Sequence, residues 1–175
     1  MNVLGISAHS YDSSAALVSD GRVVASSTEE RFTRQSHDPN FPQFAVEFCL
    51  EKGGLAAHEL DAVVFFEEPH GKFSRIMTSS LAGFPGSGAG FIRNAKTWLE
   101  HKLWVREEIS KKLDLHPKKI RFVPRHQSQA AQAFVGSPFD EAAVLVVDTV
   151  GEWASTSLCS GSYQDGRLEI TEHEN

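Results

Sequence analysis

The sequence predicts an α/β fold in which a mixed sheet is flanked by helices, and three observations lead to that prediction. Runs of β-favouring apolar residues alternate with helical segments along the 175 residues. The apolar run 144–147 ends in Asp148, and a turn that contains Gly151 follows it. The chain opens in the same way, because the apolar run 3–6 leads into the polar segment 7–14. Two strand–loop units of this kind predict two polar loops that face a common cleft.

Nucleotide-binding proteins of the actin, Hsp70 and sugar-kinase type are built with two such loops, so the expected fold is actin/Hsp70-like (ribonuclease H-like). Strands are expected at residues 2–8, 13–19, 22–28, 61–66, 120–123, 142–148, 153–160 and 167–171. Helices are expected at 42–52, 91–113 and 126–135. Asp20-Gly21 predicts a tight hairpin turn, and Gly53-Gly54 predicts the end of the first helix. Residues 67–90 predict irregular structure, since prolines and glycines recur there.

The glycine-rich stretch Gly86–Gly90 lies in this segment. It lacks a preceding strand and a following Lys-Ser/Thr, so it predicts a surface loop rather than a phosphate-binding loop.

The order of elements divides the chain into a first actin-like half-domain, residues 1–140, and the opening strands of a second half-domain, residues 141–175. Three strands without a helix of their own would leave one face of their sheet uncovered. We therefore expect the second half-domain to be incomplete in this chain. We also expect a dimer, or a partner chain, to cover residues 141–175. Four apolar residues would lose exposure on association: Val144, Val146, Trp153 and Leu158.

Composition narrows the class of protein. The net charge of −6 argues against a nucleic-acid partner. The sequence has neither an apolar run long enough for a membrane span nor the pattern of a signal peptide. Cys49 and Cys159 lie far apart beside apolar residues, which favours buried free thiols and a cytoplasmic protein.

Several short motifs, in order along nearly the whole chain, resemble the NodU/CmcH-type O-carbamoyltransferases. The matching segments are Leu4–Ala8, Asp12–Leu17, Glu29–Arg34, His37-Asp38, Phe41-Pro42, Lys102–Trp104, Ser137–Phe139, Glu141–Val144 and Asp148–Leu158. Enzymes of that family are several times longer, so the chain resembles their N-terminal part. The resemblance implies an actin-like domain related to the tRNA threonylcarbamoyl-transfer ATPases.

The resemblance also implies a chemistry. Family members use ATP and carbamoyl phosphate, and they pass the carbamoyl group to a hydroxyl of a small molecule in biosynthesis. It places the catalytic positions at Tyr11, Asp12 and His37. It places nucleotide binding at Asp148, Thr149, Gly151 and Glu152. From the residues alone, Asp148 is either a phosphate or metal contact or a turn former, and Glu152 is either a loop hydrogen-bonding residue or a catalyst.

The chain departs from the family at the metal site. Family members read His-His-Leu-Ser-His where this chain reads Arg125-His126-Gln127-Ser128-Gln129, and the first and last histidines bind an Fe or other divalent ion with the aspartate at Asp148. Arg125 and Gln129 replace those two histidines, so Asp148 alone remains of the three metal ligands. Arg125 either pairs with Asp148 in place of the metal or lies in solvent. His126 should point away from this site.

A family histidine is also replaced by Tyr11, a poor general base near neutral pH, for which His9 is a candidate substitute. Two functions therefore remain open. The chain is either the N-terminal part of a carbamoyltransferase that is inactive alone, or a degenerate homologue that binds a nucleotide or anion, or acts as a scaffold, without metal chemistry.

Overall fold

The computed structural model describes residues 1–83, 98, 102–149 and 151–174. The chain forms two compact units, of which the first comprises Met1–Phe66 with Leu99–Phe122 and the second comprises Glu67–Trp98 with Val123–Asn175. The expected division into half-domains at residues 1–140 and 141–175 stays a prediction.

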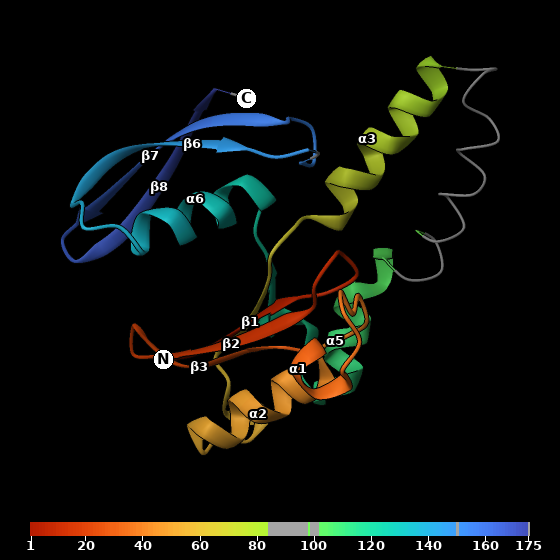
Figure 1. Cartoon of the computed structure of the whole chain (residues 1–175), viewed down its shortest axis with the longest axis vertical. Helices are drawn as coiled ribbons and strands as arrows, with labels where there is room; N and C mark the ends of the chain where they lie inside the picture. The colour runs from red at the N-terminus through yellow and green to blue at the C-terminus, as the bar shows by residue number, and fades with distance from the viewer. Residues whose placement is uncertain (84–97, 99–101, 150, 175) are drawn as a thin grey trace. The chain divides into compact units, whose positions relative to one another are not determined.

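The first unit contains a five-stranded mixed sheet in the order β3-β2-β1-β4-β5. Figure 1 labels three of its strands, β1, β2 and β3. Its strands are β1 (Asn2–Ser7), β2 (Ser14–Ser19), β3 (Arg22–Thr28), β4 (Ala62–Phe65) and β5 (Ile120–Phe122). The first three strands are antiparallel, whereas β4 pairs in parallel with both β1 and β5. This is the mixed α/β sheet that the sequence predicts, and each of these strands lies within two residues of its expected range.

Among its described residues this unit has the α-helices α1 (Glu30–Thr33), α2 (Gln43–Gly53) and α5 (Val105–Leu113). Alternate residues of the strands, such as Leu4 and Leu17, are fully buried and pack with Val46 of α2 and Ile109 of α5 in one core. Since side chains alternate across a strand, a single face of the sheet supplies this core. Burial of that apolar face is the main source of the unit's stability.

The predicted turns are present. Asp20 and Gly21 both have positive φ, at 49° and 77°, which is the backbone of a two-residue hairpin turn. Gly54 ends α2 with a φ of 63°, a left-handed conformation that glycine adopts without strain.

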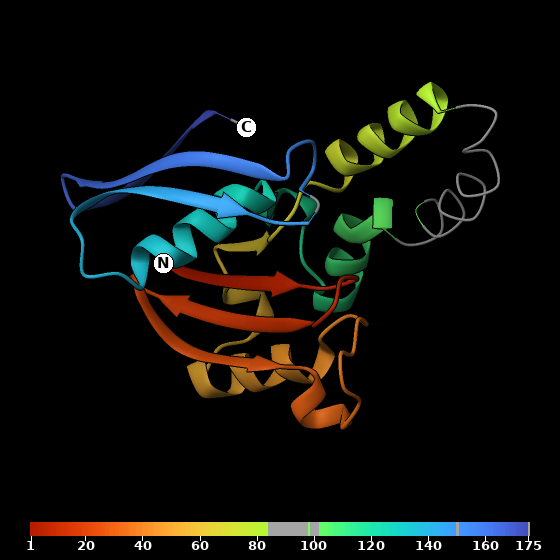
Figure 2. The same ribbon diagram turned by 45° about the horizontal axis from the view of Figure 1, so that its top comes forward.

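The second unit contains α3 (Pro69–Ala82), α6 (Arg125–Val135) and a three-stranded antiparallel sheet. The strands are β6 (Glu141–Val147), β7 (Thr156–Gln164) and β8 (Arg167–Glu174), in the order β6-β7-β8. Helix α6 lies along this sheet, as Figure 2 shows, and its Ala130 packs with Val146 and Cys159. A Cβ at Gly161 would lie 2.6 Å from the Phe134 ring, so glycine permits this close approach.

The expectation of a sheet without a covering helix is wrong. Helix α6, which precedes the strands in the sequence, covers one face of the sheet. Val144 and Val146 point to this covered face, and Val146 is only 7% exposed. The uncovered face instead carries Leu145, Val147 and Leu158, because a strand exposes every second residue.

Two further expectations need correction. Residues 69–82 form α3 rather than irregular structure, because Pro69 occupies the first helical turn, where its missing N–H breaks no hydrogen bond. The expected helix 91–113 is not continuous, since Lys102–Trp104 form a 3₁₀ turn before α5. Residues 91–97 and the Gly86–Gly90 stretch lie outside the described residues. Within the described residues, the helices are too short or too polar to span a membrane.

Candidate functional site

The candidate site lies in the second unit, in the connection between β6 and β7. Asp148 follows β6 directly, and its N–H donates to the carbonyl of Ser155 at 2.8 Å. Gly151 N–H donates to the Ala154 carbonyl at 3.0 Å. These two bonds close the connection into a compact loop and hold Asp148 at the end of β6. The strand is not buried throughout, since alternate residues such as Leu145 and Val147 are exposed.

Arg125 and Gln129 of α6 both donate to the same oxygen of Asp148. The distance from Arg125 Nε to Asp148 Oδ2 is 2.5 Å, and the distance from Gln129 Nε2 to that oxygen is 3.0 Å. Residues four apart share one face of a helix, which is why both reach one carboxylate. Arg125 therefore pairs with Asp148 rather than lying in solvent, and its side chain is 17% exposed.

This arrangement keeps Asp148 ionised. Burial alone raises the pKa of Asp148, but hydrogen bonds from Arg125 and Gln129, the charge of Arg125 and the Thr149 amide outweigh it. Together they lower the pKa of Asp148 from 3.8 to about 2. Thr149 N–H donates to Asp148 Oδ1 at 2.7 Å, so both carboxylate oxygens accept hydrogen bonds.

A second carboxylate, Glu67, completes the cluster and was missed in the sequence. Its side chain is 3% exposed, accepts from Lys72 Nζ at 2.8 Å and lies 3.8 Å from Arg125 Nη1. Glu67 and Asp148 carry two negative charges, and Lys72 and Arg125 carry two positive charges. Glu67 could have been found, because it follows the apolar strand β4 closely, just as Asp148 follows β6.

The donor set does not fit the divalent metal that the resemblance implies. A guanidinium has no lone pair to offer, and Gln129 presents its amide N–H₂ rather than its oxygen to Asp148. Among the described residues, no group of three or more His, Cys, Asp or Glu side chains could hold a metal ion. The position is instead filled by an arginine held between two carboxylates.

Glu152 joins the site loop to the starts of two helices. Its Oε1 accepts the backbone N–H of Glu68 at 3.0 Å and that of Arg125 at 2.9 Å. Arg125 is the first residue of α6, so its backbone N–H has no acceptor within the helix. The residue before it, Pro124, has no side-chain acceptor, and Glu152 supplies one. The structure thus shows Glu152 as a loop hydrogen-bonding residue.

His126 points away from Asp148, as expected, and toward β7. The His126 Nδ1 lies 2.6 Å from Ser157 Oγ, and Ser157 Oγ donates to Glu172 Oε1 at 2.8 Å. His126 and Ser157 are buried, with exposures of 4% and 1%. Neither Ser157 nor Glu172 was predicted from the sequence.

The catalytic positions predicted near the N-terminus lie in the first unit. Asp12 Oδ1 and His37 Nδ1 are 3.0 Å apart, so the structure brings these two residues together. Tyr11 is 77% exposed. His9 lies 2.7 Å from Glu108 Oε2.

The motif residue Glu29 has a structural role. Its two carboxylate oxygens accept the N–H groups of Phe44 at 3.1 Å and Ala45 at 2.8 Å, both in the first turn of α2.

The four residues predicted to bind nucleotide, Asp148, Thr149, Gly151 and Glu152, all lie in the second unit.

Comparison with known proteins identifies a family. Residues 2–173 match the model named carbamoyltransferase N-terminus. The chain is 46% identical over 169 residues to an uncharacterised protein of Synechocystis sp., a match that covers 91% of this chain and 27% of the relative. It is 30% identical over 158 residues to the nodulation protein NolNO of Sinorhizobium fredii, with coverage of 87% and 21%. The chain thus spans about a quarter of the length of these relatives.

Solved structures support the fold. YeaZ from Pseudomonas aeruginosa is similar with a TM-score of 0.52 at 15% sequence identity, over 99% of this chain and 66% of that protein. A second Pseudomonas aeruginosa protein, described as similar to peptidase YeaZ, gives a TM-score of 0.51. These similarities confirm the predicted actin-like α/β fold.

Proposed function

Because the chain belongs to the carbamoyltransferase family and matches its N-terminal domain, we propose that it is part of an enzyme that transfers a carbamoyl group from carbamoyl phosphate to a hydroxyl of a small molecule. ATP is the proposed co-substrate, bound at Asp148, Thr149, Gly151 and Glu152. The chain spans only 27% and 21% of its relatives, so we further propose that these 175 residues do not catalyse the transfer alone.

The Asp12–His37 pair supports a role in proton transfer. If Nδ1–H of His37 donates to the Asp12 carboxylate at 3.0 Å, the other ring nitrogen is left to accept a proton. In the proposed reaction the acceptor hydroxyl gives its proton to His37, and the oxygen forms a bond to the carbamoyl carbon. The bond from that carbon to the leaving phosphoryl oxygen breaks, and the leaving group departs with the electron pair. Tyr11 would donate a hydrogen bond.

The observation that carries the proposal for the second unit is the Arg125–Asp148 pair. A guanidinium supplies a fixed positive charge and hydrogen-bond donors, but it does not act as a strong Lewis acid. We therefore propose that this protein works without a metal at Asp148. The partly exposed Asp148–Glu152 loop then serves binding and positioning.

A specific observation favours the second candidate, a binding or scaffolding module without carbamoyl transfer. The two family metal positions, Arg125 and Gln129, are both committed to hydrogen bonds with the third position. These hydrogen bonds would keep the structure of the site in a protein that no longer carries out the metal-dependent reaction.

Radiolabelled transfer distinguishes the two candidates. The natural protein that carries these residues would be incubated with ¹⁴C-carbamoyl phosphate, ATP and a panel of hydroxylated small molecules, with and without chelator. Transfer that persists in chelator and falls at least about a hundredfold in Asp12→Asn supports the enzyme, since a positioned acid–base group contributes about 10²–10⁴-fold.

The matched control is Asp165→Asn, in the exposed hairpin turn between β7 and β8, where a positive φ of 49° suits asparagine. Binding of ATP without any transfer would instead support the module, and transfer that requires added metal would contradict the metal-free proposal.

A further inference from the structure

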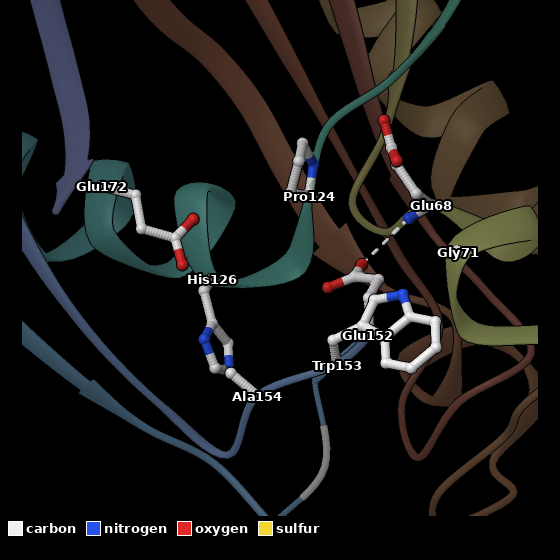
Figure 3. A pocket seen from close by; sticks show the side chains of 8 residues that line it. All are labelled: Glu68, Gly71, Pro124, His126, Glu152, Trp153, Ala154 and Glu172. Carbon is white, nitrogen blue, oxygen red and sulfur yellow. Dashed lines mark hydrogen bonds between the residues drawn. The ribbon is translucent and has the colours of Figure 1, made fainter. Parts of the chain in front are cut away.

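A pocket of about 230 Å³ opens beside the candidate site, within the second unit. Figure 3 shows that the loop residues Glu152, Trp153 and Ala154 line it together with the start of α6. Glu172 of β8 and the start of α3 complete the lining. Glu152 is also one of the proposed ATP contacts, but the carbamoyl-transfer proposal gives no role to the other residues that line this pocket.

The His126 ring lines the pocket with one nitrogen unused. Ser157 has a single hydroxyl hydrogen, which it donates to Glu172, so Ser157 Oγ must accept from Nδ1–H of His126. The relay fixes the tautomer and leaves a lone pair on His126 Nε2 whenever the ring is neutral. That nitrogen is buried and has no hydrogen-bond partner among the described residues. Leaving a buried polar atom without a hydrogen bond is unfavourable, so a partner with an N–H or O–H group is indicated at Nε2.

Gly151 leaves room at this nitrogen. A Cβ at position 151 would lie 2.8 Å from His126 Nε2 and 2.5 Å from the Ala154 carbonyl oxygen. Any other residue would therefore crowd Nε2. Steric room at this nitrogen therefore accounts for a glycine at position 151.

The other side chains that line the pocket favour a positively charged ligand. Three glutamates are among the lining residues, Glu68, Glu152 and Glu172, and no Lys or Arg is among the described residues that line the pocket. Both backbone bonds to Glu152 use Oε1. The Trp153 indole is 59% exposed at the rim, where an aromatic face attracts a cation. A metal ion is disfavoured, because the described carboxylates and imidazoles do not converge as a ligand group.

We propose that this pocket binds a small organic ammonium group. One N–H of the ammonium donates to His126 Nε2, the carboxylates balance its charge, and Trp153 covers it. The volume is below the roughly 300–1,000 Å³ of drug-sized sites, which suits an aliphatic amine of a few heavy atoms.

Calorimetric titration of the intact protein with ethanolamine, and with ethylene glycol as its neutral isostere, tests the proposal. Hydrogen bonds to charged groups contribute about 1.5–3 kcal/mol, so we expect ethanolamine to bind about ten- to a hundredfold more tightly than ethylene glycol. Equal affinity for the two probes, or no heat with ethanolamine, would overturn it.

Variants locate the site. His126→Asn keeps an N–H for Ser157 but removes Nε2, and Glu152→Gln keeps the acceptor for both backbone N–H groups but removes the charge. Each should weaken ethanolamine binding at least about tenfold.

Gly151→Ala should block ethanolamine binding, with Gly136→Ala as the matched control because a Cβ there meets its nearest atom at 3.4 Å. Glu169→Gln on exposed β8 controls for charge. Unchanged binding in folded His126→Asn would refute the assignment.

Discussion

Glu29 in the first unit and Glu152 in the second both accept backbone N–H groups at the start of a helix, but they do so differently. Glu29 is 2% exposed and uses both carboxylate oxygens, one for Phe44 and one for Ala45. Glu152 is half-buried and accepts two N–H groups with Oε1 alone. A carboxylate whose two oxygens both accept backbone N–H groups has a structural role. One that commits a single oxygen can stabilise a loop and still face a ligand.

The ion pairs of the two units show the opposite contrast, since the buried pair is in the second unit. In the second unit, Arg125 lies between Asp148 and Glu67, and removing it would leave two carboxylates buried without their shared cation. In the first unit, the Asp12–His37 pair is largely exposed, with side-chain exposures of 48% and 70%. Solvent screens exposed pairs, so we expect little stability from this one.

The largest effect is expected for Arg125→Ala. Breaking a buried ion pair from one side costs about 3–5 kcal/mol, and we expect a loss of about 3 kcal/mol in the free energy of unfolding, measured by urea denaturation. Arg125→Lys keeps the charge but not the planar donor pair, so it should lose less. A loss below about 1 kcal/mol in Arg125→Ala would show that the cluster is not coupled.

The two capping glutamates should differ in the next measurement. Glu29→Ala leaves two N–H groups of α2 without acceptors in a buried setting, so we expect a loss of about 2–3 kcal/mol. Glu152→Ala should cost about 1 kcal/mol, because water reaches the half-buried loop. Glu169→Ala, on the exposed strand β8, should stay within about 0.5 kcal/mol of the parent. Equal losses for Glu29 and Glu152 would remove the distinction between them.

Local sequence patterns predicted the Asp148 site. The other contacts around it were not predicted, because they join residues that are far apart in the sequence. The spacing of Arg125 and Gln129 placed both on one helical face, and Asp148 followed from an apolar strand that ends in a carboxylate. Glu67 was missed because it contacts Arg125, 58 positions later, and because the prolines and glycines of 67–90 indicated a loop. The His126–Ser157–Glu172 relay depends on how β7 pairs with β8, and that register shifts between Leu158 and Cys159. A single irregularity of this kind decides which face Glu172 occupies, and no local pattern specifies it.

Acid should weaken the second unit through Asp148. Its pKa in the folded protein is about 2, below the ordinary value of 3.8, so the ionised carboxylate stabilises the fold fully above about pH 4. That contribution is lost as the pH falls through 2. The shift corresponds to about 2 kcal/mol, and urea denaturation between pH 5 and pH 2 should show the parent losing that much more than Asp148→Asn. Parallel pH profiles for the two proteins would contradict the assignment.

Restoring the two family histidines should restore metal binding. We expect the parent to bind less than a stoichiometric amount of divalent metal, measured by elemental analysis after purification without chelator. The double variant Arg125→His with Gln129→His offers two imidazoles beside Asp148 and should bind about one ion per chain. Metal at ten times its Kd would then raise the free energy of unfolding by about 1.4 kcal/mol. A stoichiometric ion in the parent that is lost in Asp148→Asn would revive a metal-dependent site.

The smallest effect concerns association through the uncovered face of the second sheet. Leu145, Val147 and Leu158 are 66%, 71% and 41% exposed, and Leu145 pairs with Leu158 across β6 and β7. A contiguous apolar patch of this kind favours association, so we propose that the protein self-associates weakly through these residues. Val144 and Val146 lie on the opposite face of the sheet, where they pack with Ala130 of α6.

Sedimentation at increasing concentration measures this association. Leu145→Lys and Leu158→Lys should shift the protein toward the monomer, because a lysine on each copy adds like charge to an apolar contact. Thr171→Lys, which adds the same charge on exposed β8, should not. Since none of these side chains is in the core, folding stability should change by less than about 1 kcal/mol. A parent that stays monomeric at the highest concentration would show that α6 alone suffices to cover this sheet, and that the exposed leucines need no partner.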